Sequence, residues 1–350
     1  MLRFSSKLNM SGFFEMSSPK FKHMNYSGLT FFDNVPWPSI RFTGGACALF
    51  SERPRQFVLK SHTYLLLCRL RLLQRSMRIP IEDGFEDVLL KAAVGQRLGH
   101  GALSVRSGLS FKEVRALLAG EFDVAHLRKV AQVLGLDADK LISLAQGDWY
   151  PSTVDLPGLE CICMPFPEAS YPDATVNCYV AFDQSSRDAI VFDAGTRAEP
   201  ILELIQSRGL HLQAVLITHA HRDHIGGVTA LSELAPAGQV YAPANEPVLG
   251  ASLLEPEAEL SVGKFQIKAV ETNGHSRGAL SYIVNGLEKQ VAFVGDSIFC
   301  LSMGGSQQGY QLALNNNRNK LLSLSTDTVL CPGHGPMTTV AQELAHNPFF

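Results

Sequence analysis

The sequence predicts an α/β protein in which two helix-covered β-sheets follow a small all-helical domain. Short β-branched or apolar runs alternate with helical stretches from about residue 159 to the last residue, which is typical of sheets packed against helices. Residues 85–149 show only helical spacing, interrupted by glycine. These two observations set the fold class and the order of the domains.

A basic segment, residues 1–80, precedes both domains. It holds 12 Lys and Arg residues against 3 Asp and Glu, whereas the other 270 residues hold 18 against 30. The segment has no steady hydrophobic period. We therefore expect a disordered extension, a translated region upstream of a working start at Met77, or an organelle-targeting arm.

Composition excludes several classes of protein. The chain of 350 residues is 46% apolar and 18% charged, as in globular proteins. No apolar run reaches about 18 residues, so no membrane span is predicted. Its seven cysteines include no CxxC pair and suggest no disulfide framework, so a reducing, cytoplasmic location is expected. Composition leaves a homodimer open.

The helical domain is expected over residues 81–149. Ser110 and Asp137 occupy N-cap positions. Five short helices, with a glycine between the second and third, resemble the phage-repressor type of helix-turn-helix domain, and Leu103–Ser110 and Leu127–Leu136 carry the resemblance. The helices are expected near Phe85–Ala93 and over Ala102–Ser107, Ser110–Leu118, Val124–Leu134 and Ala138–Ala145.

DNA binding does not follow from that resemblance. The recognition helix would be Phe111–Leu118, with Lys112, Glu113 and Arg115 exposed. Residues 97–150 hold 7 basic and 6 acidic residues, whereas binding dominated by phosphate contacts usually needs a basic face. A structural or self-associating module is therefore favoured over DNA binding through residues 97–149.

The second domain is expected over residues 150–350, after a linker within Gln146–Pro157. Its predicted strands are Leu159–Met164, Val176–Phe182, Ala189–Phe192, Ala214–Ile217, Leu260–Val262, Phe265–Val270, Leu280–Val284, Gln290–Val294 and Thr328–Leu330. Its predicted helices are Glu199–Arg208, Ile225–Leu234, Leu312–Leu324 and Val340–His346.

Four residues able to bind a metal follow the Ala214–Ile217 strand: His219, His221, Asp223 and His224. A strand that ends in a His and Asp cluster indicates a loop carrying metal ligands. The first three alternate, so an extended backbone would place them on one side, and the chain must turn for His224 to join them.

Three later strands end in similar segments. They place His275, Asp296 and His334 next to or near glycine, which lets the backbone approach a buried site closely. With these segments, the chain from about Leu159 strongly resembles the metallo-β-lactamase superfamily. The resemblance implies an αββα sandwich with two metals at one edge of the sheets.

The ligand assignment rests on that resemblance. It implies that His219, His221 and His275 hold one metal, that Asp223, His224 and His334 hold the second, and that Asp296 bridges them. It also implies that Asp193 supports the loops from beneath. Asp223 and Asp296 are the expected catalytic residues.

Within the superfamily, the segments Asn177–Tyr179, Pro332–Thr339 and His346–Phe349 resemble the glyoxalase II (hydroxyacylglutathione hydrolase) group. Full-length members carry a C-terminal helical domain that contributes to glutathione binding, and this sequence ends 16 residues after His334. The glutathione contacts are therefore not implied. Candidate substrate loops are Phe166–Thr175 and Ser302–Tyr310.

The predicted activity is hydrolysis of a thioester, hydroxyacylglutathione-like, by a metal-bound hydroxide. Imidazole and carboxylate ligands suit two zinc ions, with iron or manganese as alternatives. A thiolate leaves without a dedicated general acid, although Tyr171, Tyr179 and Tyr310 are candidates for one. The competing hypotheses are a one-iron persulfide dioxygenase, a lactone hydrolase and a ligand-sensing DNA-binding regulator.

Overall fold

The computed structural model describes residues 78–166, 173–306 and 309–350. Almost all of the basic segment 1–80 lies outside this part of the chain, as do portions of both candidate substrate loops. Residues Met77–Phe350 form one compact unit. Among the described residues, no helix is long and apolar enough to cross a membrane.

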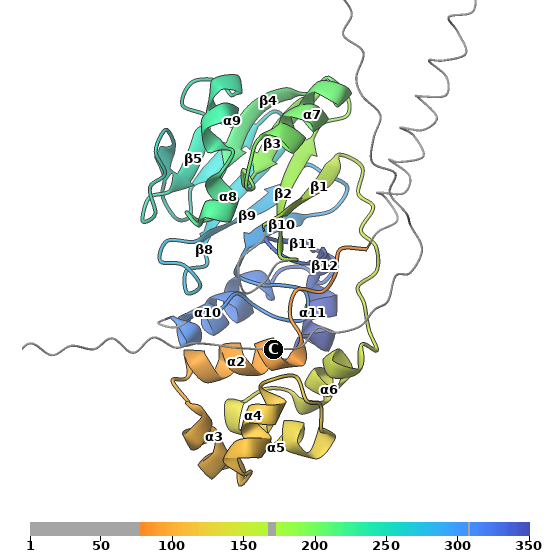
Figure 1. Ribbon diagram of the computed structural model, residues 1–350. Helices are drawn as coiled ribbons and strands as arrows, with labels where there is room; N and C mark the ends of the chain where they lie inside the picture. The colour runs from red at the N-terminus through yellow and green to blue at the C-terminus, as the bar shows by residue number, and fades with distance from the viewer. Residues whose placement is uncertain (1–77, 167–172, 307–308) are drawn as a thin grey trace, which may run out of the picture. The chain divides into compact units, whose positions relative to one another are not determined.

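Two six-stranded sheets form the centre of this unit, which confirms the expected sandwich (Figure 1). The first sheet has the order β1-β2-β3-β4-β5-β6 and the second β12-β11-β10-β9-β8-β7. The strands of the first sheet are Leu159–Pro165, Thr175–Phe182, Asp188–Phe192, His211–Leu216, Val240–Pro243 and Ser252–Leu254, for β1 to β6. Those of the second are Glu259–Val262, Phe265–Glu271, Leu280–Asn285, Val291–Gly295, Val329–Pro332 and Thr338–Thr339, for β7 to β12.

The inner faces of the sheets share one apolar core. Phe192 of β3 stacks on Phe293 of β10 with ring centroids 3.6 Å apart, and Tyr282 of β9 is fully buried beside them. Because side chains alternate along a strand, the other face of each strand needs a second layer. The core therefore fixes which strand ends meet at the edge of the sandwich.

Helices supply that second layer. On the first sheet, α7 (Glu199–Arg208) and α9 (Val228–Leu234) bury apolar residues against the strands. On the second sheet, the π-helix η1 (Asn317–Leu321) and α11 (Val340–His346) do the same. The predicted bounds of α7 and α11 are confirmed.

The single helix predicted over Ile225–Leu234 is wrong. The chain forms α8 (Arg222–Ile225) and α9, separated by Gly226 and Gly227. A Cβ on Gly226 would lie 2.2 Å from the carbonyl oxygen of Thr196, so these glycines permit a close backbone approach rather than a helix interior. The strands β5 and β6 were not predicted.

Within the part of the chain that the structure describes, five helices precede the sheets: α2 (Phe85–Gly95), α3 (His100–Ser107), α4 (Phe111–Leu117), α5 (Val124–Leu134) and α6 (Ala138–Gln146). Ser110 and Asp137 cap α4 and α6 as predicted, because each side chain accepts a hydrogen bond from the first turn. The described cysteines, five in number, are all free.

The helical module, defined here as α2–α6, shares its core with the second sheet's helices. Phe85, Leu89 and Ala92 of α2 pack in one cluster with Tyr310 and Leu314 of α10 (Tyr310–Asn316). Figure 1 shows α2 directly beside α10. Phe349 also joins this cluster. The module is therefore packed against α10, the helix that follows the Asp296 loop.

Candidate metal centre

The structure brings all seven predicted ligands together at one edge of the sandwich. They form two groups in which potential ligand atoms lie within 4.8 Å of one another: His219, His221, His275 and Asp296, and Asp223, His224 and His334. Each lies after a strand: β4 leads to His219, His221, Asp223 and His224, β8 to His275, β10 to Asp296 and β11 to His334. Loops at strand ends are where a rigid scaffold presents a site.

A backbone turn divides the four clustered ligands between the two groups. His221 is extended and acts as the N-cap of α8, which begins at Arg222. Asp223 and His224 therefore lie in the first helical turn, while His219 and His221 remain on the extended segment. The chain turns one residue before Asp223, so that residue joins His224 rather than the alternating pair.

The first group presents three imidazole nitrogens to one another. Nδ1 of His221 lies 3.0 Å from Nε2 of His219 and 3.1 Å from Nε2 of His275. One nitrogen can donate at most one proton, so His221 cannot satisfy both neighbours. A cation placed among the three lone pairs would satisfy all of them.

Asp296 lies between the groups. Its Oδ2 lies 3.3 Å from Nε2 of His275 and 3.5 Å from Nε2 of His334, and its Oδ1 lies 3.4 Å from Nε2 of His224. In the second group, Nε2 of His334 is also 3.3 Å from Oδ2 of Asp223. One carboxylate therefore faces ligands of both groups.

The outward nitrogens of four histidines are held by other groups. Nδ1 of His275 bonds the Gly305 carbonyl at 2.8 Å, and Nδ1 of His334 bonds the Thr175 carbonyl at 2.6 Å. A carbonyl only accepts, so both nitrogens carry the proton, and Nε2 presents its lone pair to the centre. Such outer hydrogen bonds orient metal-binding histidines.

Asp193 fixes the other two histidines, His219 and His224. Its carboxylate accepts hydrogen bonds from the backbone N–H of Thr218 at 2.7 Å and from the Thr218 hydroxyl at 2.9 Å, and it lies 2.9 Å from Nδ1 of His224. Because the Thr218 proton is used there, its oxygen is free to accept from Nδ1 of His219 at 3.0 Å. Asp193 thus holds the two most buried histidines.

Two buried atoms test whether a cation fits. Nε2 of His224 and Oδ1 of Asp296 are inaccessible to solvent and have no hydrogen-bond partner among the described residues. An unpaired polar atom in a protein interior is costly, and both atoms face the centre of the cluster. The His and Asp donor set fits divalent zinc, iron or manganese.

The electrostatics of the cluster keep the imidazoles of His219 and His275 neutral and the carboxyl group of Asp296 ionised. Burial lowers the pKa of His219 well below its usual value, and burial also lowers that of His275. Burial opposes charge on His224 as well, yet the carboxylates of Asp193 and Asp296 raise its pKa to about 10. Despite its burial, Asp296 has a pKa held well below the usual range by His334 and His224.

Sequence reasoning missed Glu246, which follows β5. Its carboxylate accepts hydrogen bonds from the backbone N–H of Ala220 at 3.0 Å and of Gly278 at 2.9 Å. It thereby joins the His219–His221 loop to the loop that follows His275. No sequence signal marks it, because the pairing depends on the unpredicted strand β5.

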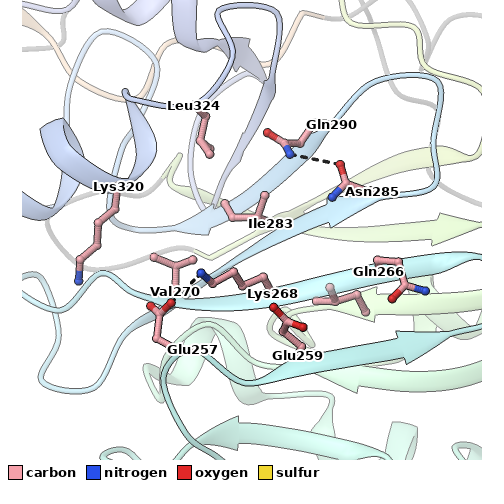
Figure 2. Close-up of a pocket in the computed structure, with 11 residues that line it drawn as sticks. Glu257, Glu259, Gln266, Lys268, Val270, Ile283, Asn285, Gln290, Lys320 and Leu324 are labelled. Carbon is pink, nitrogen blue, oxygen red and sulfur yellow. Dashed lines mark hydrogen bonds and ion pairs between the residues drawn. The ribbon is translucent and has the colours of Figure 1, made fainter.

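A separate cavity of about 520 Å³ lies on the outer face of the second sheet (Figure 2). Figure 2 shows its mixed polar and apolar lining, in which Lys268 pairs with Glu257 at 2.7 Å. None of the seven clustered residues lines it. The cavity is therefore distinct from the His and Asp cluster.

Comparison with known proteins agrees with this geometry. The sequence profile of the metallo-beta-lactamase superfamily matches residues 171–334. A "Probable metallo-hydrolase YqgX" of Bacillus subtilis is 31% identical over 204 residues, which make up 51% of this chain and 94% of that protein. The chain belongs to the metallo-beta-lactamase superfamily.

Other members of the superfamily are similar in part. A hydroxyacylglutathione hydrolase (GloC) of Haemophilus influenzae is 29% identical over 49% of this chain and 92% of its own length. A hydroxyacylglutathione hydrolase of Vibrio cholerae is 36% identical over 42% of this chain but only 57% of its own length. The solved BLEG-1 B3 metallo-beta-lactamase is 31% identical, with a TM-score of 0.46, over 54% of this chain and 99% of that chain.

Proposed function

We propose that this protein hydrolyses a thioester with two divalent metal ions, most simply zinc, held by the seven clustered residues. The observation that carries the proposal is the position of Asp296 between two groups of imidazole and carboxylate donors. Iron and manganese are the alternative metals, because they accept the same donors.

Each residue has a defined task in this proposal. His219, His221 and His275 would hold one ion, Asp223, His224 and His334 would hold the other, and Asp296, which faces both groups, would contact both. When bound, two such ions would activate water at neutral pH and polarise the scissile carbonyl. Asp223 and Asp296 supply the two negative charges of the ligand set. Asp193, Thr175 and Gly305 hold the histidines in the tautomers that binding requires.

Two observations support a thioester rather than an amide. An amide needs a general acid for its leaving group, whereas a thiolate does not. Among the described tyrosines proposed as acids, Tyr179 is buried and donates to the Pro332 carbonyl at 2.7 Å, and Tyr310 is buried against the helical module. Tyr171 lies outside the described residues. Relatives named hydroxyacylglutathione hydrolases add support.

Metal analysis combined with a thioester assay tests the proposal. Protein purified without added metal is analysed for metal content and then assayed on S-D-lactoylglutathione. Two metal ions per chain with thiol release are expected. One iron with oxygen uptake on a persulfide would favour the dioxygenase alternative, and hydrolysis of a lactone but no thioester would favour a lactonase.

We also propose that the helical module is a helix-turn-helix type of domain with a structural role. The shared core between α2 and α10 supports this role, because an apolar face of the helical module is buried against α10. A DNA-binding domain that acted independently would not need this contact. A mobility-shift titration against genomic fragments at low salt tests it. Retardation at micromolar protein would favour the DNA-binding regulator.

A further inference from the structure

Lys91 of α2 joins the helical module to the loop that follows Asp296. Its Nζ lies 2.5 Å from Oδ2 of Asp83, donates to the Met303 carbonyl at 3.0 Å, and lies 4.7 Å from the centroid of the Phe299 ring. Asp83 and Met303 are both buried. The ammonium group is therefore fixed between one carboxylate and one loop.

That loop, residues 299–305, contacts ligands of both groups. The Gly305 carbonyl holds Nδ1 of His275 at 2.8 Å. The Gly304 N–H donates to the Asp296 carbonyl at 3.1 Å. The Phe299 ring lies 5.3 Å, centroid to centroid, from the ring of His334. Displacement of this loop would therefore misorient three of the seven ligands.

The segment just before α2 lies against the second ligand loop. A Cβ on Gly335 would lie 3.4 Å from the backbone nitrogen of Glu82, which shows how closely the two segments pack. Oε1 of Glu82 is 3.9 Å from Nδ1 of His334. The residues leading into α2 thus contact the His334 loop, and α2 itself contacts the 299–305 loop, at independent points.

We propose that Lys91, held in place by Asp83, is a positioning residue of the metal centre. It stabilises the 299–305 loop in the conformation that orients His275 and Asp296. This role rests on the metal centre assigned above, but not on the identity of the substrate. Lys91 belongs to the helical module and lies outside the residues that match the superfamily profile. Through Lys91, the helical module therefore becomes part of the structure that supports the metal centre.

The alternative is a stabilising ion pair with no effect on the metal centre. The two roles differ in what they change. Loss of an orienting contact in the second shell of a metal site weakens metal binding roughly 10–100-fold. Loss of an ion pair alone lowers the stability of metal-free and metal-loaded protein equally and leaves metal affinity unchanged.

The experiment measures zinc affinity of the full chain by competition with a chromophoric chelator. Lys91→Met is expected to weaken binding at least about 10-fold. Since this variant leaves the Asp83 carboxylate buried without its partner, Asp83→Asn combined with Lys91→Met is measured as well. The double variant has no unpaired buried carboxylate at position 83. It is expected to keep the wild-type melting temperature in EDTA while still binding zinc weakly.

Lys140→Met is the matched control. Lys140 of α6 also reaches from the helical module to backbone oxygens, those of Leu344 at 2.8 Å and Phe350 at 2.6 Å, neither in a ligand-bearing loop. Wild-type zinc affinity is expected for it. Wild-type zinc affinity in the double variant, or an equal loss of zinc affinity in Lys140→Met, would overturn the role of Lys91 but not the metal centre. Failure of the unmodified protein to bind zinc, iron or manganese would overturn the metal centre and this role together.

Discussion

Oδ1 of Asp296 lies 3.4 Å from Nε2 of His224, and neither atom has a hydrogen-bond partner among the described residues. Both atoms are buried and both face the centre of the cluster. The other carboxylate oxygen, Oδ2, lies 3.3 Å from Nε2 of His275 in the first group. One cation on each side of this carboxylate would satisfy every one of these atoms.

Asp296→Ala is expected to lose metal and hydrolytic activity together, because it removes the one side chain shared by both groups. Metal content by mass spectrometry and thioester turnover are the measurements. Asp327→Ala removes an exposed carboxylate that accepts a local hydrogen bond from Ser325, and is expected to leave both unchanged. Full activity in Asp296→Ala would refute the bridging assignment.

Asp193→Asn is expected to weaken metal binding roughly 10–100-fold while the protein still folds. Asp193 has a φ of 59°, a backbone conformation that asparagine tolerates. An amide NH₂ facing His224 would force Nδ1 to accept, which moves the ring proton to Nε2 and blocks the metal lone pair. Asp188→Asn is the control, because the Asp188 carboxylate accepts a hydrogen bond from the Gln213 side chain at 2.8 Å and contacts no ligand.

The ligands could be predicted from sequence because they lie in loops that follow strands with a clear pattern. His219, His275, Asp296 and His334 lie one to four residues beyond the ends of such strands, and strand ends at one edge converge. The contacts that hold these ligands could not be predicted in the same way. Lys91 and the Met303 carbonyl that it contacts are 212 positions apart, and nothing local in α2 indicates the pairing.

Fold prediction failed where close packing overrides local pattern. The apolar run after His224 suggested one helix, but Gly226 lies so near the Thr196 carbonyl that the chain forms two. Similarly, β5 and β6 are short and gain their stability from neighbours in the sheet, which a sequence does not show. Glu246 follows β5, so it was missed for the same reason.

Glu343 is expected to make folding stability depend on pH. It is fully buried, and burial raises the pKa of its carboxyl group from 4.5 to about 7. The folded state binds the proton of Glu343 more tightly than the unfolded state does. Protonation of Glu343 therefore stabilises the folded protein fully below pH 4.5, and this stabilisation is lost as the pH rises through about 7. Glu343→Gln has no buried carboxylate to ionise. Its free energy of unfolding, relative to that of the wild type, should therefore rise by up to about 3 kcal/mol between pH 5 and pH 9.

Urea unfolding in EDTA at both pH values measures this difference without a contribution from bound metal. Glu203→Gln, on the exposed face of α7, is the control and should show a constant difference from wild type. A pH-independent difference for Glu343→Gln would show that the carboxyl group does not titrate in this range in the folded protein.

Gly304→Ala is expected to disrupt the metal centre by steric overlap. A Cβ at this position would lie 2.0 Å from the Asp296 carbonyl oxygen and 2.7 Å from Nδ1 of His275. Neither the backbone nor the ring can move away without displacing a ligand. Overpacking of this kind costs about 1–3 kcal/mol, so a lower melting temperature and reduced zinc affinity are both expected.

The adjacent glycine provides the matched control for that substitution. A Cβ on Gly305 would have no heavy atom of the described residues within 4 Å, and an alanine there keeps the carbonyl that accepts from His275. Gly305→Ala should therefore bind zinc and melt like the wild type. If both alanine variants lose zinc equally, general stiffening of the loop, rather than overlap with Asp296 and His275, is the cause. Loss confined to Gly304→Ala would locate the constraint at the point where the loop contacts these two ligands.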